Sequence, residues 1–179
     1  MGTLNLSNGV SLSATGTAFG NSAASWSDAP PGTIIQVTSS LAAGKQSTSS
    51  TTYTTLASSS NITTTVLNSK ILVSIHCAYG NDTTGGTGNS FINLMRTAGG
   101  TDTVLLNPMA NRQSNATSYM SDFFSITYLD TPNQPAGTAI SYSVQARRVD
   151  GTPIPFIGGR ATDTAYAAGT RFTLSEVAP

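Results

Sequence analysis

Hydrophobic and polar residues alternate most clearly in the sequence SKILVSIHCAYG, residues 69–80. Every second residue from position 71 onward is apolar, whereas the residues between them are of mixed character. Alternation with a period of two places one set of side chains on one face of a β-strand. The segment therefore predicts a strand whose buried face carries Ile71, Val73, Ile75, Cys77 and Tyr79.

Other short stretches have the same strand character, and turn residues separate them. Glycine and proline recur at intervals of roughly 8–12 residues, and no segment shows the period of about 3.6 that indicates a helix. The sequence GGTD at 99–102 is typical of a hairpin turn, and VDGTPIP at 149–155 is expected to be another turn. The expected strands lie in segments 33–37, 51–58, 61–67, 69–80, 90–98, 103–107, 121–130, 139–149 and 170–177. Such a series predicts an all-β fold, an antiparallel β-sandwich for which a jelly roll is one fitting topology.

The beginning of the chain differs in composition from the remainder. Residues 1 to 69 contain two charged side chains, Asp28 and Lys45, and the other fourteen lie in 70–179. We expect residues 1–29 to form an extended N-terminal arm and residues 30–179 to form the β-sandwich domain. Two prolines at this boundary, Pro30 and Pro31, restrict the backbone and remove hydrogen-bond donors. Gly32 then permits a turn into the first strand.

Charge is scarce along the whole chain. Asp, Glu, Lys and Arg make up 9% of the residues, with a formal net charge of zero, whereas an average soluble protein has roughly 25%. Without a basic excess the chain does not attract nucleic acid, and near-neutral charge favours association. The sequence has neither the features of a signal peptide nor the roughly 18 apolar residues of a membrane helix. We expect a protein that is made in the cytoplasm, works in an assembly and binds neither nucleic acid nor a membrane.

Residues with catalytic chemistry are few and scattered. His76 is the only histidine, and its place within an apolar strand favours a packed or interface role over a general base. Cys77 is the only cysteine, which excludes an internal disulfide and favours a small buried hydrophobe. Four aspartates fall at turns or strand ends, as turn chemistry favours: Asp82, Asp102, Asp130 and Asp150. We expect a protein that is not an enzyme and has no catalytic, cofactor or metal site.

Two local features point weakly to ligands. In the loop 80–89, the side chains of Asn81, Asp82 and Asn89 offer oxygen atoms to calcium, but a plain hairpin loop is favoured because only one carboxylate contributes. Arg147 and Arg148 are adjacent in an expected strand. Strand neighbours face opposite ways, so one arginine is expected inward or at an interface and the other in solvent.

The motifs also occur in a recognisable order. They are LNLSNG, PPGTIIQV, a Ser/Thr-rich stretch, SKILVSI, INLMR, YLDTP, YSVQAR and FTLSEV, and they span residues 4 to 177. This order resembles small β-sandwich virion proteins of bacteriophages of aquatic bacteria, which act as head decoration (cement) proteins or tail-fibre modules. The resemblance implies a β-sandwich that assembles as a homotrimer on the virion and brings no catalytic residues.

Two roles follow from the resemblance. A capsid decoration or cement protein would bind the head surface and the major capsid protein, and the short chain without a repeated shaft favours this role. The alternative is a tail-fibre or receptor-binding module that faces a host surface glycan. A carbohydrate-binding module, a glycan-active enzyme and an adhesin subunit are the rivals from other classes. The expected partner-binding residues are Trp26, Pro30, Pro31, Leu4 and Leu6, because a large apolar ring in a polar arm needs a surface on which to dock.

Overall fold

The protein was analysed as a computed structural model, which describes residues 3–5, 11–13, 29–82, 88–114, 120–150, 154–159 and 168–179. All regular structure in these ranges is β-strand. In chain order the strands are β1 (Thr3–Asn5), β2 (Ser11–Ser13), β3 (Ile34–Ala42), β4 (Gln46–Ser47), β5 (Thr54–Ser58), β6 (Ile62–Thr63), β7 (Lys70–Asp82), β8 (Gly88–Ala98), β9 (Thr101–Ser114), β10 (Met120–Asp130), β11 (Ala139–Arg148), β12 (Ile154–Ile157) and β13 (Thr170–Val177). The all-β prediction is therefore confirmed.

The first sheet is built around β7. One edge of β7 pairs with β10, and the other edge pairs first with β13 and then, beyond Cys77, with β12. β3 lies outside β13, and β4 lies outside β12. β3 and β4 occupy one position in the sheet, one after the other, and so do β12 and β13, so we count each pair as one row of strands. The sheet then has the row order β3/β4, β12/β13, β7, β10.

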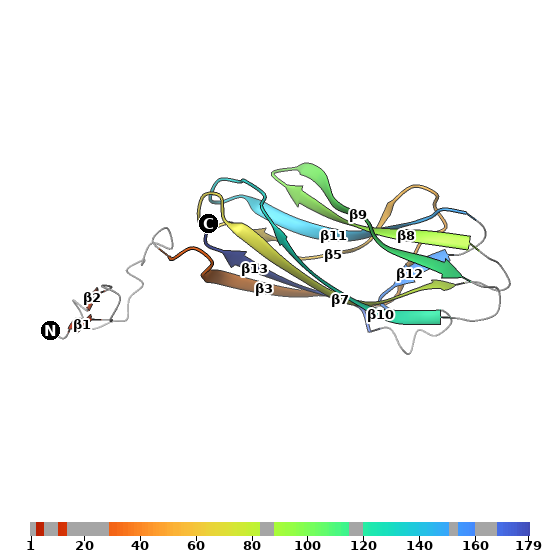
Figure 1. The fold of residues 1–179 in the computed structure, drawn as a ribbon, viewed down its shortest axis with the longest axis horizontal. Coiled ribbons are helices and arrows are strands. Elements are labelled where there is room, and N and C mark those ends of the chain that lie inside the picture. The colour runs from red at the N-terminus through yellow and green to blue at the C-terminus, as the bar shows by residue number, and fades with distance from the viewer. Residues whose placement is uncertain are drawn as a thin grey trace.

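The second sheet has the row order β5/β6, β11, β8, β9, because β5 and β6 both pair with the same edge of β11. All neighbouring rows in both sheets are antiparallel. The eight rows can be numbered along the chain, from β3/β4 as row one to β12/β13 as row eight. In spatial order, the first sheet then contains rows one, eight, three and six, and the second sheet contains rows two, seven, four and five. This is the strand order of a jelly roll, in which two Greek keys form two packed sheets (Figure 1). The predicted β-sandwich is confirmed, and its topology is the jelly roll.

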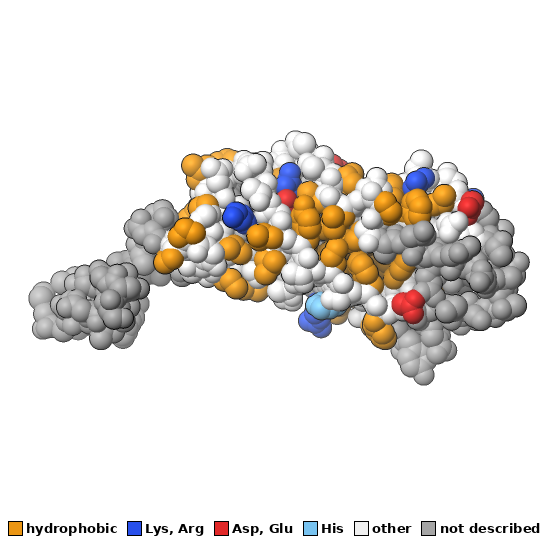
Figure 2. Space-filling view, viewed as in Figure 1, with side chains coloured by type: hydrophobic (Ala, Val, Ile, Leu, Met, Phe, Trp, Pro, Cys, Tyr) orange, Lys and Arg blue, Asp and Glu red, His pale blue; other side chains and the backbone are white. Residues whose placement is uncertain are grey.

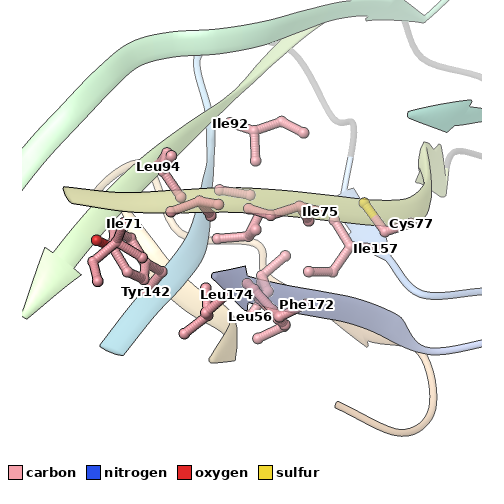
Figure 3. Close-up of a cluster of buried hydrophobic side chains, with 14 of the residues drawn as sticks. Leu56, Ile71, Ile75, Cys77, Ile92, Leu94, Tyr142, Ile157, Phe172 and Leu174 are labelled. Atoms are coloured by element: carbon pink, nitrogen blue, oxygen red, sulfur yellow. The ribbon is translucent and has the colours of Figure 1, made fainter. Parts of the chain in front are cut away.

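The core lies between the two sheets and begins with the predicted face of β7. Ile71, Val73 and Ile75 are fully buried, and Cys77 and Tyr79 are each 4% exposed. Side chains from the other sheet pack against them, as Figure 3 shows for Leu56, Ile92, Leu94 and Tyr142. Burial of each large apolar side chain contributes about 1.5–3 kcal/mol. The interior is therefore the main source of stability, and no disulfide can contribute because the chain has one cysteine.

Several sequence expectations about local structure can now be checked. The predicted hairpin turn is present between β8 and β9, where Gly99 and Gly100 have φ angles of 56° and 81°. The segment 149–155 was expected to be a turn, but Ile154 opens β12, so this expectation was wrong for its last residues. β13 stops opposite Cys77, which leaves the rest of the β7 edge for β12 to pair with.

Two other segments differ from expectation. Within 61–67 only Ile62 and Thr63 form a strand. In the expected extended arm, β1 and β2 pair antiparallel with each other, and Thr3 lies opposite Ser13. That pairing is local, so it requires no contact with the sandwich.

Gly44, Gly158 and Gly169 lie close together where the β3/β4 row and the β12/β13 row are each interrupted. Gly169 donates a backbone hydrogen bond to the Gly158 carbonyl at 2.8 Å, so the chain leaves the β12/β13 row and returns to it at one point. A Cβ atom on Gly158 would lie 2.6 Å from the Gly44 carbonyl oxygen, and one on Gly169 would lie 2.7 Å from that of Ala42. Both residues also have positive φ angles, 77° and 72°. Only glycine fits these two positions.

Candidate functional site

The chain enters the sandwich through a tight turn. The Thr33 amide donates to the Pro30 carbonyl at 3.0 Å, and Gly32 has a φ angle of 85°. Proline followed by glycine at the two central positions is the pattern of a type II turn. The turn expected at Gly32 is therefore confirmed. The Gly32 amide also donates to the Ala178 carbonyl at 3.1 Å, which places the entry point beside the end of β13.

The predicted partner-binding residues are only partly placed. Pro30 and Pro31 are both exposed at the entry turn. Leu4 lies in β1, where its backbone is opposite Leu12. Trp26 and Leu6 lie outside the described residues. The structure therefore brings Pro30 and Pro31 together at one surface and leaves the other three as predictions.

Next to this turn, the outer face of the first sheet carries apolar side chains that are exposed or half-buried. We call them the arm-exit patch: Ile34, Val37, Leu72, Leu129 and Val177. Their positions follow from the register, which aligns Val37 with Ser175, Leu72 and Leu129 across four strand rows. Ile34, Val37 and Leu129 are 54%, 58% and 49% exposed. An apolar surface of this kind is suited to contact with a partner.

A buried carboxylate fixes the loop beside the arm-exit patch. Glu176 is fully buried and accepts hydrogen bonds from Gln36 Nε2 at 2.6 Å and from the Thr65 amide at 2.7 Å. The Val66 amide donates to the same carboxylate at 3.3 Å. Burial alone raises the pKa of Glu176, but hydrogen bonds from Gln36 and Thr65 outweigh it and hold the pKa below its ordinary value. The loop after β6 is therefore held by an ionised side chain.

A second apolar surface lies where the two sheets end at β9 and β10. Hydrophobic side chains from both strands pack against the core there but stay only partly buried: Leu105, Met109, Phe124, Ile126 and Tyr128. We call this surface the β9–β10 edge. Figure 2 shows hydrophobic side chains gathered in the middle of this face of the molecule. A half-covered core edge is suited to contact with a second subunit.

A shallow groove of about 270 Å³ lies elsewhere on the outer face of the first sheet. The side chains of His76, Phe123, Ser125 and Arg171 line it, and they come from β7, β10 and β13. Register aligns Arg171 with His76 and His76 with Ser125, so the three form one row across the sheet. His76 Nδ1 lies 3.0 Å from Ser125 Oγ. Alternation put His76 on the face opposite Ile75, where a packed or interface role was expected, and its side chain is exposed there. The sequence contained no signal that pairs it with Ser125 or Arg171.

The groove has little of the chemistry that an active site needs. A hydroxyl nucleophile requires a base that is itself oriented by a third group. Ser125 and His76 have the required contact, but the third residue of their row is a cation, Arg171. Burial raises the pKa of the Cys77 thiol to about 12, so the sulfur is not a thiolate at neutral pH. This arrangement is suited to binding a ligand.

The loop 80–89, a weak candidate calcium site in the sequence, can be checked in part. The described part of loop 80–89 uses its amides within the protein: Asn81 accepts from Ser90 Oγ at 2.6 Å, and Asn89 Nδ2 donates to Asp150 at 3.2 Å. Within the described ranges, no three His, Cys, Asp or Glu side chains gather as metal ligands. The same ranges contain no helix able to cross a membrane.

The adjacent arginines, of which one was expected inward or at an interface and the other in solvent, are both half-buried. Arg147 lies over the rings of Tyr53 and Phe91, at 5.0 and 5.5 Å from their centroids. Such cation–π contact covers the guanidinium on the outer face of the second sheet.

Comparison with known proteins gives a likeness of fold only. No protein-family profile matches the chain, and no curated protein sequence matches it. Among solved structures, the infectious bursal disease virus Gx strain gives a TM-score of 0.41 at 10% identity, over 80% of this chain and 37% of that chain. The VP2 subviral particle of infectious bursal disease virus gives 0.40 at 12% identity, over 80% of this chain and 37% of that one. This chain thus spans less than two fifths of their length, and a likeness at this level says nothing about what it binds.

Proposed function

We propose that this protein is a bacteriophage virion structural protein, a capsid decoration or cement protein that binds the head surface as a homotrimer. The observation that carries the proposal is the half-covered core at the β9–β10 edge, where Phe124, Ile126 and Tyr128 need a neighbouring subunit to complete their burial. The low charge of the chain, 9% of residues with a net charge of zero, removes the repulsion that keeps monomers apart.

The arm and the arm-exit patch supply the attachment to the particle. Pro30 and Pro31 are exposed where residues 1–29 join the sandwich, and Ile34 and Val37 extend an apolar surface from that point. A partner that covers this surface also receives the arm, so both contacts fall on one neighbour. We assign that neighbour as the major capsid protein and the location as the virion, after synthesis in the host cytoplasm. Nucleic acid and membrane are not partners in this proposal, and the protein is not an enzyme.

A tail-fibre or receptor-binding module is the second candidate. The groove beside His76 and Arg171 favours it, because a receptor-binding protein needs a solvent-facing ligand site. Both candidates use the same sandwich and the same subunit contact. They differ in where the trimer lies on the particle and therefore in its number.

Copy number per virion separates the two candidates. Quantitative mass spectrometry of purified particles, normalised to the major capsid protein, is expected to find hundreds of copies for a decoration protein. A few to a few tens of copies would assign the protein to the tail instead. Absence from purified particles would overturn the virion proposal in both forms.

A further inference from the structure

We propose that the groove on the outer face of the first sheet binds a sugar that carries a carboxylate. The site consists of Arg171 on β13, His76 on β7, and Phe123 and Ser125 on β10. This inference goes beyond the proposed function, because it holds for a head protein and for a tail protein alike.

Arg171 supplies the charge that selects the carboxylate. Its side chain is exposed in the groove and makes no salt bridge or hydrogen bond with any residue in the described part of the chain. Two other arginines differ, since Arg96 is paired with Asp130 and Arg147 is stacked on aromatic rings. A guanidinium presents two parallel N–H groups that match the two oxygens of a carboxylate. Arg171 is thus available for an external anion.

His76 and Ser125 supply hydrogen bonds to sugar hydroxyls. The contact between His76 Nδ1 and Ser125 Oγ, at 3.0 Å, fixes the orientation of the exposed imidazole. Nε2 is then the ring nitrogen left for a ligand, as a donor or an acceptor according to the tautomer. A sugar hydroxyl both donates and accepts, so either tautomer suits it.

Phe123 supplies an apolar wall. Its side chain is 91% exposed, the highest value among the exposed large hydrophobic residues. It lies opposite Ala78 in the register, whose small side chain leaves the phenyl ring uncovered on that side. A flat aromatic ring at a groove edge can bury the C–H face of a sugar ring, while the polar groups beside it fix orientation.

The spacing of these groups fits a sugar unit. Arg171, His76 and Ser125 occupy three adjacent strands, and neighbouring strands lie about 4.8 Å apart, so the row spans roughly 10 Å. The protein has no net charge to attract anions generally. Selectivity for an acidic sugar must therefore come from this local arrangement.

The test is isothermal titration calorimetry of the full-length protein with a glucuronate-containing tetrasaccharide. The control ligand is the same tetrasaccharide after reduction of each carboxylate to an alcohol. Wild-type protein is expected to bind the acidic form at least tenfold more tightly than the reduced form. Arg171→Gln should abolish that preference. Phe123→Ala should weaken binding of both forms by about tenfold, and His76→Gln should weaken both to a smaller extent.

Two matched variants control for charge and for apolar surface. Arg148→Gln removes one positive charge from β11 in the other sheet, and Leu67→Ala removes a 62% exposed side chain from the loop after β6. Both are expected to bind as the wild type does, with thermal unfolding curves that show every variant to be folded. Equal affinity for the two sugars, no binding of either, or an equal loss in Arg148→Gln would overturn the proposal. Tighter binding of inorganic phosphate than of the tetrasaccharide would overturn it as well. These outcomes are independent of copy number on the particle.

Discussion

Asp130, the last residue of β10, accepts two hydrogen bonds from the guanidinium of Arg96 in the opposite sheet, at 2.9 and 3.0 Å. The Tyr142 hydroxyl donates a further bond to the same carboxylate at 2.8 Å. The side chains of Arg96 and Asp130 are 13% and 4% exposed. Burial, reinforced by the charge of Asp130, raises the pKa of Tyr142 far above its ordinary value. The three residues form a polar bridge between the sheets.

Breaking this bridge should destabilise the fold strongly. In Asp130→Asn the Arg96 charge stays buried without its counter-ion, which costs about 3 kcal/mol of unfolding free energy. Urea denaturation followed by circular dichroism measures the loss. Asp102→Asn is the control, because Asp102 is exposed and accepts a hydrogen bond from Thr97 Oγ1 at 2.7 Å, and its effect should stay within about 0.5 kcal/mol. Equal effects of the two substitutions would show that the bridge is not a stabilising unit.

Stability should fall in acid through Glu176. Its pKa is held below the ordinary value of 4.5, so the ionised form stabilises the fold at pH values above 4.5. That contribution is lost as the pH falls from 4.5 through the lower pKa of the folded protein. Glu176→Gln should be less stable than the wild type at pH 7, and the difference should shrink at pH 3. Urea midpoints of both proteins at several pH values test this, and a constant difference would contradict it.

The glycine contact at the strand interruption should be intolerant of a methyl group. Gly158→Ala combines a positive φ angle with a Cβ atom 2.6 Å from the Gly44 carbonyl oxygen. Gly137 has a similar φ angle of 85° with nothing within 4 Å, so Gly137→Ala shows the backbone cost alone, about 1 kcal/mol. The first substitution should cost at least twice as much as the second. Comparable unfolding free energies would mean that the neighbouring backbone moves freely.

The β9–β10 edge should control oligomeric state. Val104 is 50% exposed on the edge strand β9, opposite Met95, so Val104→Glu places a charge on the outer face beside this edge without entering the core. Light scattering of the wild type should give three times the chain mass of 18.3 kDa, whereas Val104→Glu should give the monomer. Ser58→Glu is the control, since β5 lies at the opposite edge of the same sheet and its variant should remain a trimer. A monomeric wild type at tens of micromolar would contradict the proposed contact.

Removing the arm should separate folding from attachment. Deletion of residues 2–26 keeps Ala29, the entry turn and the hydrogen bond from Gly32 to Ala178. The truncated protein should therefore unfold at the same temperature as the full chain but no longer bind particles that lack it. Co-sedimentation with such particles measures the second effect. Normal binding after truncation would show that the arm is dispensable.

The sequence predicted the fold well where burial follows a simple period. The face of β7 from Ile71 to Tyr79 was correct because a strand covered on one face must alternate. The hairpin at Gly99 and Gly100 was correct because such turns need residues that accept positive φ angles. β12 was missed because its four residues pair only where β13 ends, which is a property of the tertiary arrangement.

The surfaces were harder to predict from the sequence. Alternation placed His76 on the outer face, but Ser125 and Arg171 join it only through strand pairing that is distant in the chain. The expected partner residues concentrated on the arm, whereas the described part of the chain shows apolar surface on the sandwich itself, at Val37 and Leu129. Single-strand patterns identify which face is outward but not which outward faces become neighbours.

The hydrogen bond between Gly158 and Gly169 also makes this jelly roll suitable for the insertion of foreign peptides. The strand register on both sides is set by pairing with β7, so it does not depend on the length of the chain between these glycines. A foreign sequence inserted after Gly159 and before Ala168 would leave and re-enter at one fixed point. Because Ala168 and Gly169 line the groove, that graft would stand at its rim. Exchanging this segment thus offers a way to change what the rim of the groove presents while the sandwich stays unchanged.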